Sequence, residues 1–192
     1  MGTAKILAFA GSTRKGSFND KLLTFATKIA RDAGAEVTHI SLADYDMPLL
    51  SQDWEAEHGL PEAAKRLKDL FLAHNGLLLA CPEYNGSLTP LLKNAIDWVS
   101  RPASKEETPL SCYVGKTAGL ISASPGALGG LRGLRHVREV LSNIQVLVTP
   151  AQFALSTAHS AFDEERNLVD EKQTGRLKSV VDQLVRVCGN QG

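Results

Sequence analysis

Cysteine, net charge and long apolar runs are all scarce in this chain of 192 residues. The three cysteines are widely spaced and form no C-x-x-C pair, which argues against a disulfide framework and a zinc site and suits a reducing cytoplasm. Lys plus Arg number 21, as do Asp plus Glu, so the formal net charge is zero. The chain therefore lacks the long-range field that attracts nucleic acid, and its neutral surface gives little protection against self-association.

No apolar run approaches the ~20 residues of a membrane-spanning helix. The first run, Ile6 to Ala10, is too short for the core of a signal peptide. We therefore expect a cytoplasmic protein with no membrane partner. Hydrophobic residues make up 43% and charged residues 22%, which is ordinary for a globular chain, and the length predicts one domain over residues 1–192.

Five short apolar runs alternate with segments whose apolar residues recur at helical spacing. The runs are Lys5–Ala10, Glu36–Ser41, Gly76–Cys81, Lys116–Ser122 and Gln145–Val148. The helical segments are Leu22–Ala33, Leu60–Phe71, Leu88–Val99, Leu134–Leu141 and Leu177–Cys188. This alternation predicts an α/β fold, a parallel sheet with helices on both faces. The third and fourth runs do not alternate in polarity, which is typical of strands buried on both sides.

Ligands of such folds bind at the carboxyl ends of the strands, so the loop after each run is a candidate site. The first loop reads Gly11-Ser12-Thr13-Arg14-Lys15-Gly16-Ser17-Phe18-Asn19 and leads into a helix. Backbone N–H groups at that helix start, three hydroxyl side chains and the charge of Arg14 are suited to a phosphate. A helix-capping turn with incidental serines is the alternative.

Two other phosphate motifs fail on this loop. A Walker A sequence would need lysine where Ser17 stands, and a dinucleotide fingerprint would need glycine in place of Thr13. The loop is therefore predicted to hold a single terminal phosphate.

Two further loops have the composition of a ring-binding site. Pro82-Glu83-Tyr84-Asn85-Gly86-Ser87 follows the third run, and its aromatic and Asn-Gly turn could wall a flat ring. The residues after the fourth run, 122–130, include Gly126, Gly129 and Gly130, which would allow close backbone approach to a planar ligand. Alternatively, Tyr84 is a packed surface aromatic, and the glycine-rich segment is only a flexible connection.

Taken together, the three loops and Leu92-Lys93-Asn94-Ala95-Ile96-Asp97-Trp98 resemble the NADPH-dependent FMN reductase family, a branch of the flavodoxin-like fold. The similarity spans roughly Ile6 to Val148. It implies a five-stranded parallel sheet of order 2-1-3-4-5, FMN and NADPH as cofactors, and a small-molecule electron acceptor. Bacterial quinone, chromate and azo-dye reductases belong to this family. Because the family includes oligomeric reductases, the resemblance also implies that this chain forms a homodimer or homotetramer.

The resemblance also implies site residues. The FMN phosphate would be held by Ser12, Arg14, Ser17, Phe18 and Asn19. The isoalloxazine ring would be lined by Pro82, Glu83, Tyr84, Asn85 and Gly86, with Ser122, Ser124 and Gly126 near its other edge. Because hydride passes between nicotinamide and flavin, no catalytic acid or base is expected. The segment Gly86–Thr89 is less bulky than in some relatives, so the preferred acceptor is not implied.

Two other functions remain open alternatives. One is a flavodoxin-type electron carrier that docks proteins, although such carriers are typically strongly acidic and this chain is neutral. The other is a phosphate-binding module without flavin or activity. The histidines lack metal-ligand spacing and are interpreted as structural or exposed.

One helix carries Arg132, Arg135 and Arg138, which either assist NADPH phosphates or a subunit contact, or form a solvated face with Arg135 paired to Glu139. Trp98, beside Asp97 and Arg101, is either an interface residue or packed against the sheet.

Overall fold

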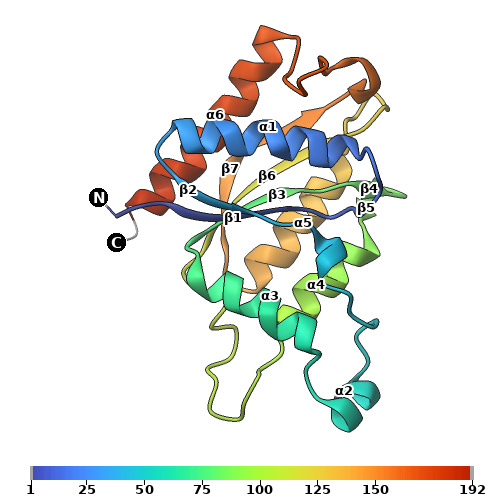
Figure 1. Ribbon diagram of the computed structural model, residues 1–192, viewed down its shortest axis with the longest axis vertical. Helices are drawn as coiled ribbons and strands as arrows, with labels where there is room; N and C mark the ends of the chain where they lie inside the picture. Colours follow the sequence, from blue (N-terminus) through green and yellow to red (C-terminus); the bar gives the residue numbers. More distant parts are fainter. Residues whose placement is uncertain (1, 191–192) are drawn as a thin grey trace.

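The computed structural model describes residues 2–190, which form one parallel sheet between two layers of helices (Figure 1). The sheet strands are β1 (Lys5–Ala10), β2 (Glu36–His39), β3 (Gly76–Ala80), β6 (Thr117–Ala123) and β7 (Leu147–Leu155). Their order across the sheet is β2-β1-β3-β6-β7, with every pair parallel. Counted among themselves, the five strands have the order 2-1-3-4-5. The predicted fold is confirmed.

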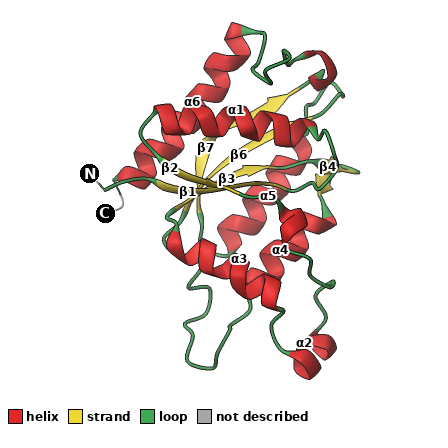
Figure 2. Cartoon of the chain, in the orientation of Figure 1, coloured by secondary structure: helices red, strands yellow, loops and turns green. Residues whose placement is uncertain are grey.

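The helices divide between the two faces of the sheet (Figures 1 and 2). One face is covered by α1 (Phe18–Asp32) and α6 (Glu171–Gly189), whose apolar residues share one buried cluster. The other is covered by α3 (Glu62–Ala73), α4 (Pro90–Ser100) and α5 (Leu131–Asn143), which share a second cluster. The central strand β3 is buried along its whole length, because both layers cover it.

Strand β7 is longer than predicted. The apolar run ends at Val148, but the strand continues to Leu155, with a register irregularity opposite Ala118 and Leu120. Pro150 lies within it and cannot donate a ladder hydrogen bond. Such a proline is tolerated because β7 is an edge strand, next to β6 alone.

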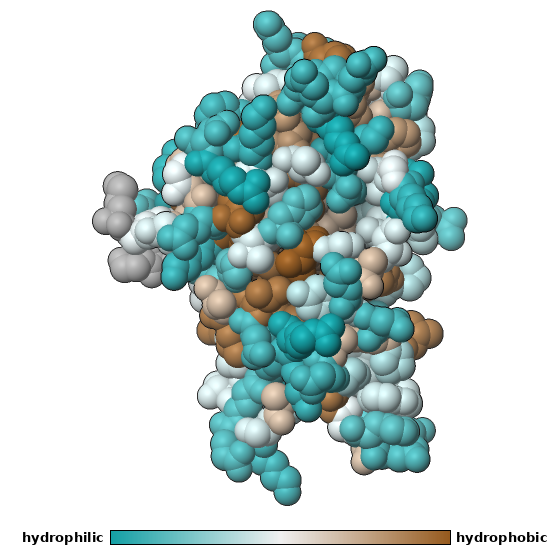
Figure 3. Space-filling model, in the orientation of Figure 1, coloured by the Kyte–Doolittle hydropathy of each residue, from teal (hydrophilic) through white to brown (hydrophobic). Residues whose placement is uncertain are grey.

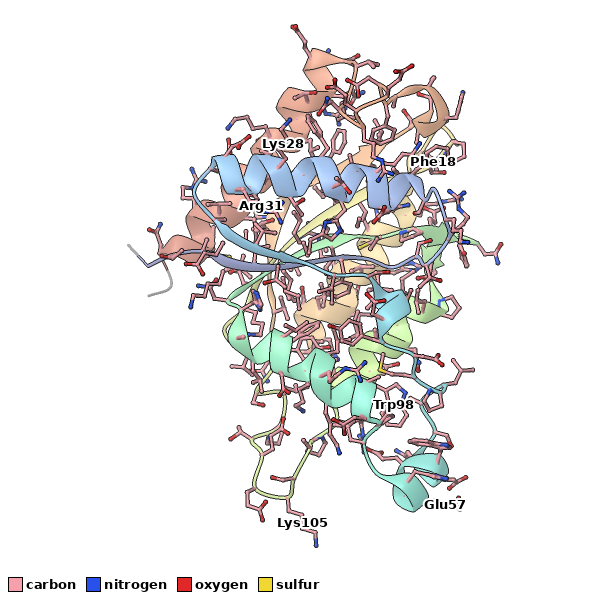
Figure 4. All side chains as sticks on the ribbon, in the orientation of Figure 1. Phe18, Lys28, Arg31, Glu57, Trp98 and Lys105 are labelled. Atoms are coloured by element: carbon pink, nitrogen blue, oxygen red, sulfur yellow. The ribbon has the colours of Figure 1, made fainter. Side chains whose placement is uncertain are left out.

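Several short elements were not predicted. A two-stranded antiparallel hairpin joins β4 (Glu83–Tyr84) and β5 (Ser87–Leu88), and η1 (Leu42–Asp44) and η2 (Ala158–Ser160) are 3-10 turns. Helix α2 (Gln52–His58) has no buried residue and therefore no apolar periodicity to reveal it. It projects from the body, as Glu57 in Figure 4 shows.

The interpretation of Trp98 as a subunit-interface residue is wrong. Its side chain is fully buried, its Nε1 donates a hydrogen bond to the Pro48 carbonyl at 2.7 Å, and its ring meets the edge of Trp54. Figure 4 shows it between the body and α2. Arg101, the C-cap residue of α4, likewise pairs with Glu55 of α2, so the end of α4 holds the segment that carries α2.

One face of the molecule has an apolar band at its middle. Figure 3 shows brown residues mainly in a band across the middle of one face, where β2 lies between α1 and α3. The side chains of β2 are only partly buried, because β2 is an edge strand. Within residues 2–190, no helix is long and apolar enough to cross a membrane.

Candidate cofactor cleft

Segments that follow β1, β3 and β6 meet at the carboxyl edge of the sheet around a cleft of about 380 Å³. The residues that line it are Ser12, Arg14, Ser17, Phe18, Asn19, Pro82, Glu83, Tyr84, Ala123, Ser124 and Pro125. Its volume lies within the range of small-molecule sites, about 300–1,000 Å³. The structure thus brings the first loop together with parts of the other two.

The first loop is built around the start of α1. Ser17 is the N-cap residue, and its side chain accepts a hydrogen bond from the Asp20 N–H at 3.4 Å. The N–H groups of Phe18 and Asn19, in the first turn, have no carbonyl one turn earlier in the helix to bind. Gly16 has a φ of +68°, a conformation that favours glycine, and it lets the loop turn into the helix. These N–H groups, at the positive end of the helix dipole, are suited to an anion.

Arg14 supplies the positive charge of this end of the cleft. Its side chain is exposed, and within residues 2–190 it forms no ion pair. The guanidinium lies 5.6 Å from the ring centroid of Phe18, a cation–π distance. Figure 4 shows Phe18 at the end of α1 that faces this edge of the sheet. The aromatic contact thus orients a cation that has no acidic partner.

Asn19 has a structural role that its position in the loop does not suggest. Its side chain is buried, and it donates to the Ala123 carbonyl at 2.9 Å while accepting from the Ala123 N–H at 3.0 Å. The amide therefore joins the start of α1 to the end of β6. Asn19 lines the cleft, but its side-chain polar atoms are already bonded, so its backbone N–H is the group left for a phosphate.

Gly11 is a packing residue rather than a ligand-binding one. A Cβ there would lie 3.0 Å from Leu92 Cβ and 3.2 Å from Thr89 Oγ1. Thr89 is buried, donates to the Gly11 carbonyl at 2.8 Å and accepts from the Leu92 N–H as the N-cap of α4. Sequence analysis missed this threonine, although a Thr-Pro pair at a helix start is a capping signal.

The β4–β5 hairpin forms the second wall. Asn85 and Gly86 form its turn with φ of +51° and +84°, the signs that a tight hairpin turn requires. This turn holds both residues at the tip, so they do not line the cleft as was expected. Pro82 is buried and Tyr84 is 57% exposed, so the wall presents an aromatic side chain that is open to solvent.

Glu83 connects this wall to α5. Its carboxylate accepts hydrogen bonds from Arg132 Nε at 2.8 Å, from the Arg132 N–H at 3.0 Å and from the Gly133 N–H at 3.1 Å. Gly130, the N-cap residue of α5, has no side chain to cap the helix, so Glu83 caps it from the hairpin. Burial opposes the charge, but these hydrogen bonds outweigh it and hold the pKa of Glu83 below its ordinary value.

The third wall differs from what was expected. Ser122 is fully buried, and its hydroxyl donates to the Gly129 carbonyl at 2.7 Å, so it supports the glycine loop from beneath instead of facing the cleft. Gly126 is exposed and does not line the cleft. A Cβ on Gly129 would lie 2.7 Å from Leu155 backbone, and one on Gly130 would lie 2.9 Å from Ser122 Cβ. These two glycines are needed for packing within the protein.

Ser124 does line this wall, and its hydroxyl accepts from the Gly126 N–H at 3.2 Å. The neighbouring Ala123 and Pro125 line it too and were not predicted, although they flank Ser124 in the sequence. With Pro82 and Tyr84 opposite, the cleft has a flat, largely apolar end next to its polar end.

The arrangement fits FMN. A phosphate would meet the hydroxyls of Ser12 and Ser17, the charge of Arg14 and the free N–H groups of α1, and a flat ring would lie between the two loops. Among the described residues that line the cleft, Arg14 carries a positive charge, the Glu83 carboxylate is hydrogen-bonded to the start of α5, and the Tyr84 side chain is open to solvent. The cleft thus offers binding and orientation, with no paired acid and base.

The three arginines of α5 differ in their hydrogen-bond and ion-pair partners. Arg132 pairs with Glu83, and Arg138 donates to the carbonyls of Val148 and Thr149. The pair between Arg135 and Glu139, which belonged to one of the two interpretations of this helix, is not formed within residues 2–190. The same residues contain no group of three or more His, Cys, Asp or Glu side chains that could hold a metal ion.

Comparison with known proteins gives a consistent family. The sequence model of the family described as NADPH-dependent FMN reductase matches residues 4–160. The chain is 38% identical over 170 residues to an NAD(P)H-dependent FMN reductase of Pseudomonas aeruginosa, covering 88% of this chain and 86% of that protein. It is 36% identical over 145 residues to a quinone reductase of Escherichia coli K12, covering 75% and 72% respectively.

Among solved structures, the chain is similar to a flavoenzyme NAD(P)H:(acceptor) oxidoreductase of Paracoccus denitrificans. The TM-score is 0.83 at 28% identity, over 99% of this chain and all of that one.

Proposed function

The chain belongs to the NADPH-dependent FMN reductase family and is an NAD(P)H-dependent oxidoreductase that uses FMN; from this premise we propose that it reduces small quinones. Relatives at 32–38% identity are named as quinone or FMN reductases. The observation that carries the proposal is a cleft with a phosphate-binding end and an open, flat end beside Tyr84.

The protein residues bind and orient. We assign the phosphate to Ser12, Arg14 and Ser17 and to the N–H groups of Phe18 and Asn19. We assign the ring to Pro82, Tyr84 and Ser124, with Glu83 fixing the hairpin to α5. When bound, FMN supplies hydride and electron transfer.

The shape of the cleft explains how one site could serve two substrates. Pro82, directly before the hairpin, is buried, while Tyr84 is more than half exposed, so the wall is covered at Pro82 and open to solvent at Tyr84. A flat nicotinamide and a flat quinone need the same apolar surface and would use it in turn. Glu83 joins this wall to the start of α5, the helix that follows the glycine loop.

The proposal also covers the oligomeric state of the chain and its cellular location. The chain would form a homodimer or homotetramer in the cytoplasm. Tyr84 on the hairpin and Leu128 in the glycine loop are 57% and 52% exposed, and a partner subunit that contacts these two loops would cover both side chains. The three cysteines are free and buried, in keeping with a reducing compartment.

The test is an NAD(P)H oxidation assay with the FMN-loaded protein. NADPH absorbance should fall at a rate that rises with added 1,4-benzoquinone under anaerobic conditions. Failure to take up FMN, or FMN-loaded protein that does not oxidise either nucleotide with the quinone, would contradict the proposal.

A further inference from the structure

Thr89 is buried where the first loop, the start of the hairpin wall and helix α4 meet. It is 2% exposed, and it is the N-cap residue of α4. A Cβ on Gly11 would lie 3.2 Å from Thr89 Oγ1 and 3.2 Å from Pro82 Cδ. Because Gly11 has no side chain, the start of the first loop can pack against both the threonine and the hairpin wall. Thr89 is therefore in contact with the backbone that leads into the phosphate end of the cleft.

The Thr89 hydroxyl makes two hydrogen bonds that serve different purposes. It accepts from the Leu92 N–H at 3.2 Å, which is the ordinary bond of a helix cap. It also donates to the Gly11 carbonyl at 2.8 Å, a bond that α4 itself does not need. The Gly11 N–H bonds separately to the Ala80 carbonyl of β3. Within residues 2–190 the Gly11 carbonyl has no other hydrogen-bond donor, so its direction depends on Thr89.

The same bond sets the direction of the next N–H group. The Gly11 carbonyl and the Ser12 N–H belong to one planar trans peptide unit, so they point in opposite directions. With the carbonyl held by Thr89, the Ser12 N–H points away from Thr89. Among the described residues 2–190 this N–H has no acceptor, and Ser12 lines the cleft. The first loop thus has a free backbone donor at Ser12 in addition to its hydroxyl.

The direction of the Ser12 peptide also affects the rest of the loop. Ser12 Oγ accepts from the Arg14 N–H at 3.2 Å, so the backbone geometry that is set at Gly11 continues to the residue that carries the charge. We propose that Thr89 is a positioning residue for FMN, which holds the Gly11 carbonyl and thereby aims the Ser12 N–H at the phosphate. Thr89 does not line the cleft itself, so it acts only through the loop. This inference rests on the proposed assignment of the phosphate to the first loop.

The binding test compares FMN with riboflavin, which lacks the phosphate, in fluorescence titrations of protein freed of flavin. Thr89→Val keeps the shape of the side chain but removes the hydroxyl, and it should lower FMN affinity about tenfold, or about 1.4 kcal/mol, and riboflavin affinity much less. Thr89→Ser keeps both hydrogen bonds and should keep the wild-type ratio of the two affinities. Thr149→Val is the matched control, because Thr149 is a buried threonine whose Oγ1 donates to the Ala118 carbonyl at 3.2 Å, near the amino end of β6. It should lower stability and leave the ratio unchanged.

Nuclear magnetic resonance of the wild-type protein gives a second readout, which does not require a variant to fold. The Ser12 amide proton should move downfield further on binding FMN than on binding riboflavin. An unchanged affinity ratio in Thr89→Val, or a Ser12 amide that responds equally to both flavins, would overturn the inference. An equal change of the ratio in Thr149→Val would also overturn it, because the effect would then be a general loosening of the fold.

Two outcomes separate this inference from the proposals on which it rests. Wild type that binds FMN and riboflavin equally would contradict the assignment of the phosphate to the first loop, and the inference with it. A protein with the expected affinity ratios that reduces no quinone would contradict the proposed function alone and leave the role of Thr89 supported.

Discussion

At the residue scale, we expect phosphate binding to depend most on Arg14. It is a cation without an acidic partner within residues 2–190, beside the free N–H groups of α1. We expect Arg14→Ala to lower FMN affinity by about 1.5–3 kcal/mol, the value of a charge-assisted hydrogen bond. Riboflavin, which has no phosphate, should bind as before. Fluorescence titration of both flavins measures the difference.

The neighbouring Lys15 provides a control for Arg14. It is exposed in the same loop and does not line the cleft. Lys15→Ala should leave both flavin affinities close to wild type. An FMN affinity that Arg14→Ala does not change would remove Arg14 from the site.

Removal of the Asn19 side-chain amide should lower the stability of the fold, and should not remove a direct contact with the ligand. In Asn19→Ala, the buried N–H and carbonyl of Ala123 lose their partner, at a cost of about 1–3 kcal/mol for each group left unpaired. Urea unfolding should show this loss of free energy, and FMN and riboflavin affinities should fall in the same proportion. A loss confined to FMN, with stability unchanged, would mean that the Asn19 amide contacts the phosphate.

At the scale of elements, the β4–β5 hairpin and α5 are joined by the Glu83 carboxylate. Its pKa is held below the ordinary value, so the ionised form stabilises the fold. That contribution is present above the pKa of an unfolded glutamate, about 4.3, and is lost as the pH falls through the lower folded value. The connection should therefore weaken in acid.

This predicts the pH dependence of one variant. Glu83→Gln keeps an oxygen for the Gly133 N–H but loses the charge, so it should be less stable than wild type near neutral pH. The difference in free energy of unfolding should shrink between about pH 6 and about pH 3. Glu106→Gln, an exposed glutamate in the loop before β6, should follow the wild-type curve. A difference that does not change with pH would show that the Glu83 charge is not stabilising.

At the scale of the whole molecule, assembly is the main prediction. Light scattering at micromolar concentration should give two or four times the chain mass of 20.6 kDa. Leu128→Glu, beside the cleft loop, should raise the monomer fraction because it puts a charge into the contact. Leu72→Glu, equally exposed at 52% but at the end of α3 before β3, is the control. A monomer with full NADPH oxidation would contradict the prediction.

The sequence alone determined the fold class and the position of the cleft. Strands buried on both sides need continuous apolar runs, and helices on a sheet need apolar residues one turn apart, so both signals are local. The loop after each run must then lie at the carboxyl edge of the sheet. The unusual composition of residues 11–19 and 82–87 could be recognised without knowing their neighbours.

Only the tertiary structure decided which atoms of those loops remain free. Asn19 meets Ala123 from 104 residues away, and Glu83 meets Arg132 from 49 away. Trp98 finds its partner in Pro48, 50 residues earlier. Hydrogen-bond partners at such separations leave no periodic trace, because they depend on how the layers pack and not on the local sequence. A polar or aromatic residue in a binding loop could therefore be named in advance, but whether it supports the loop or faces the ligand could not.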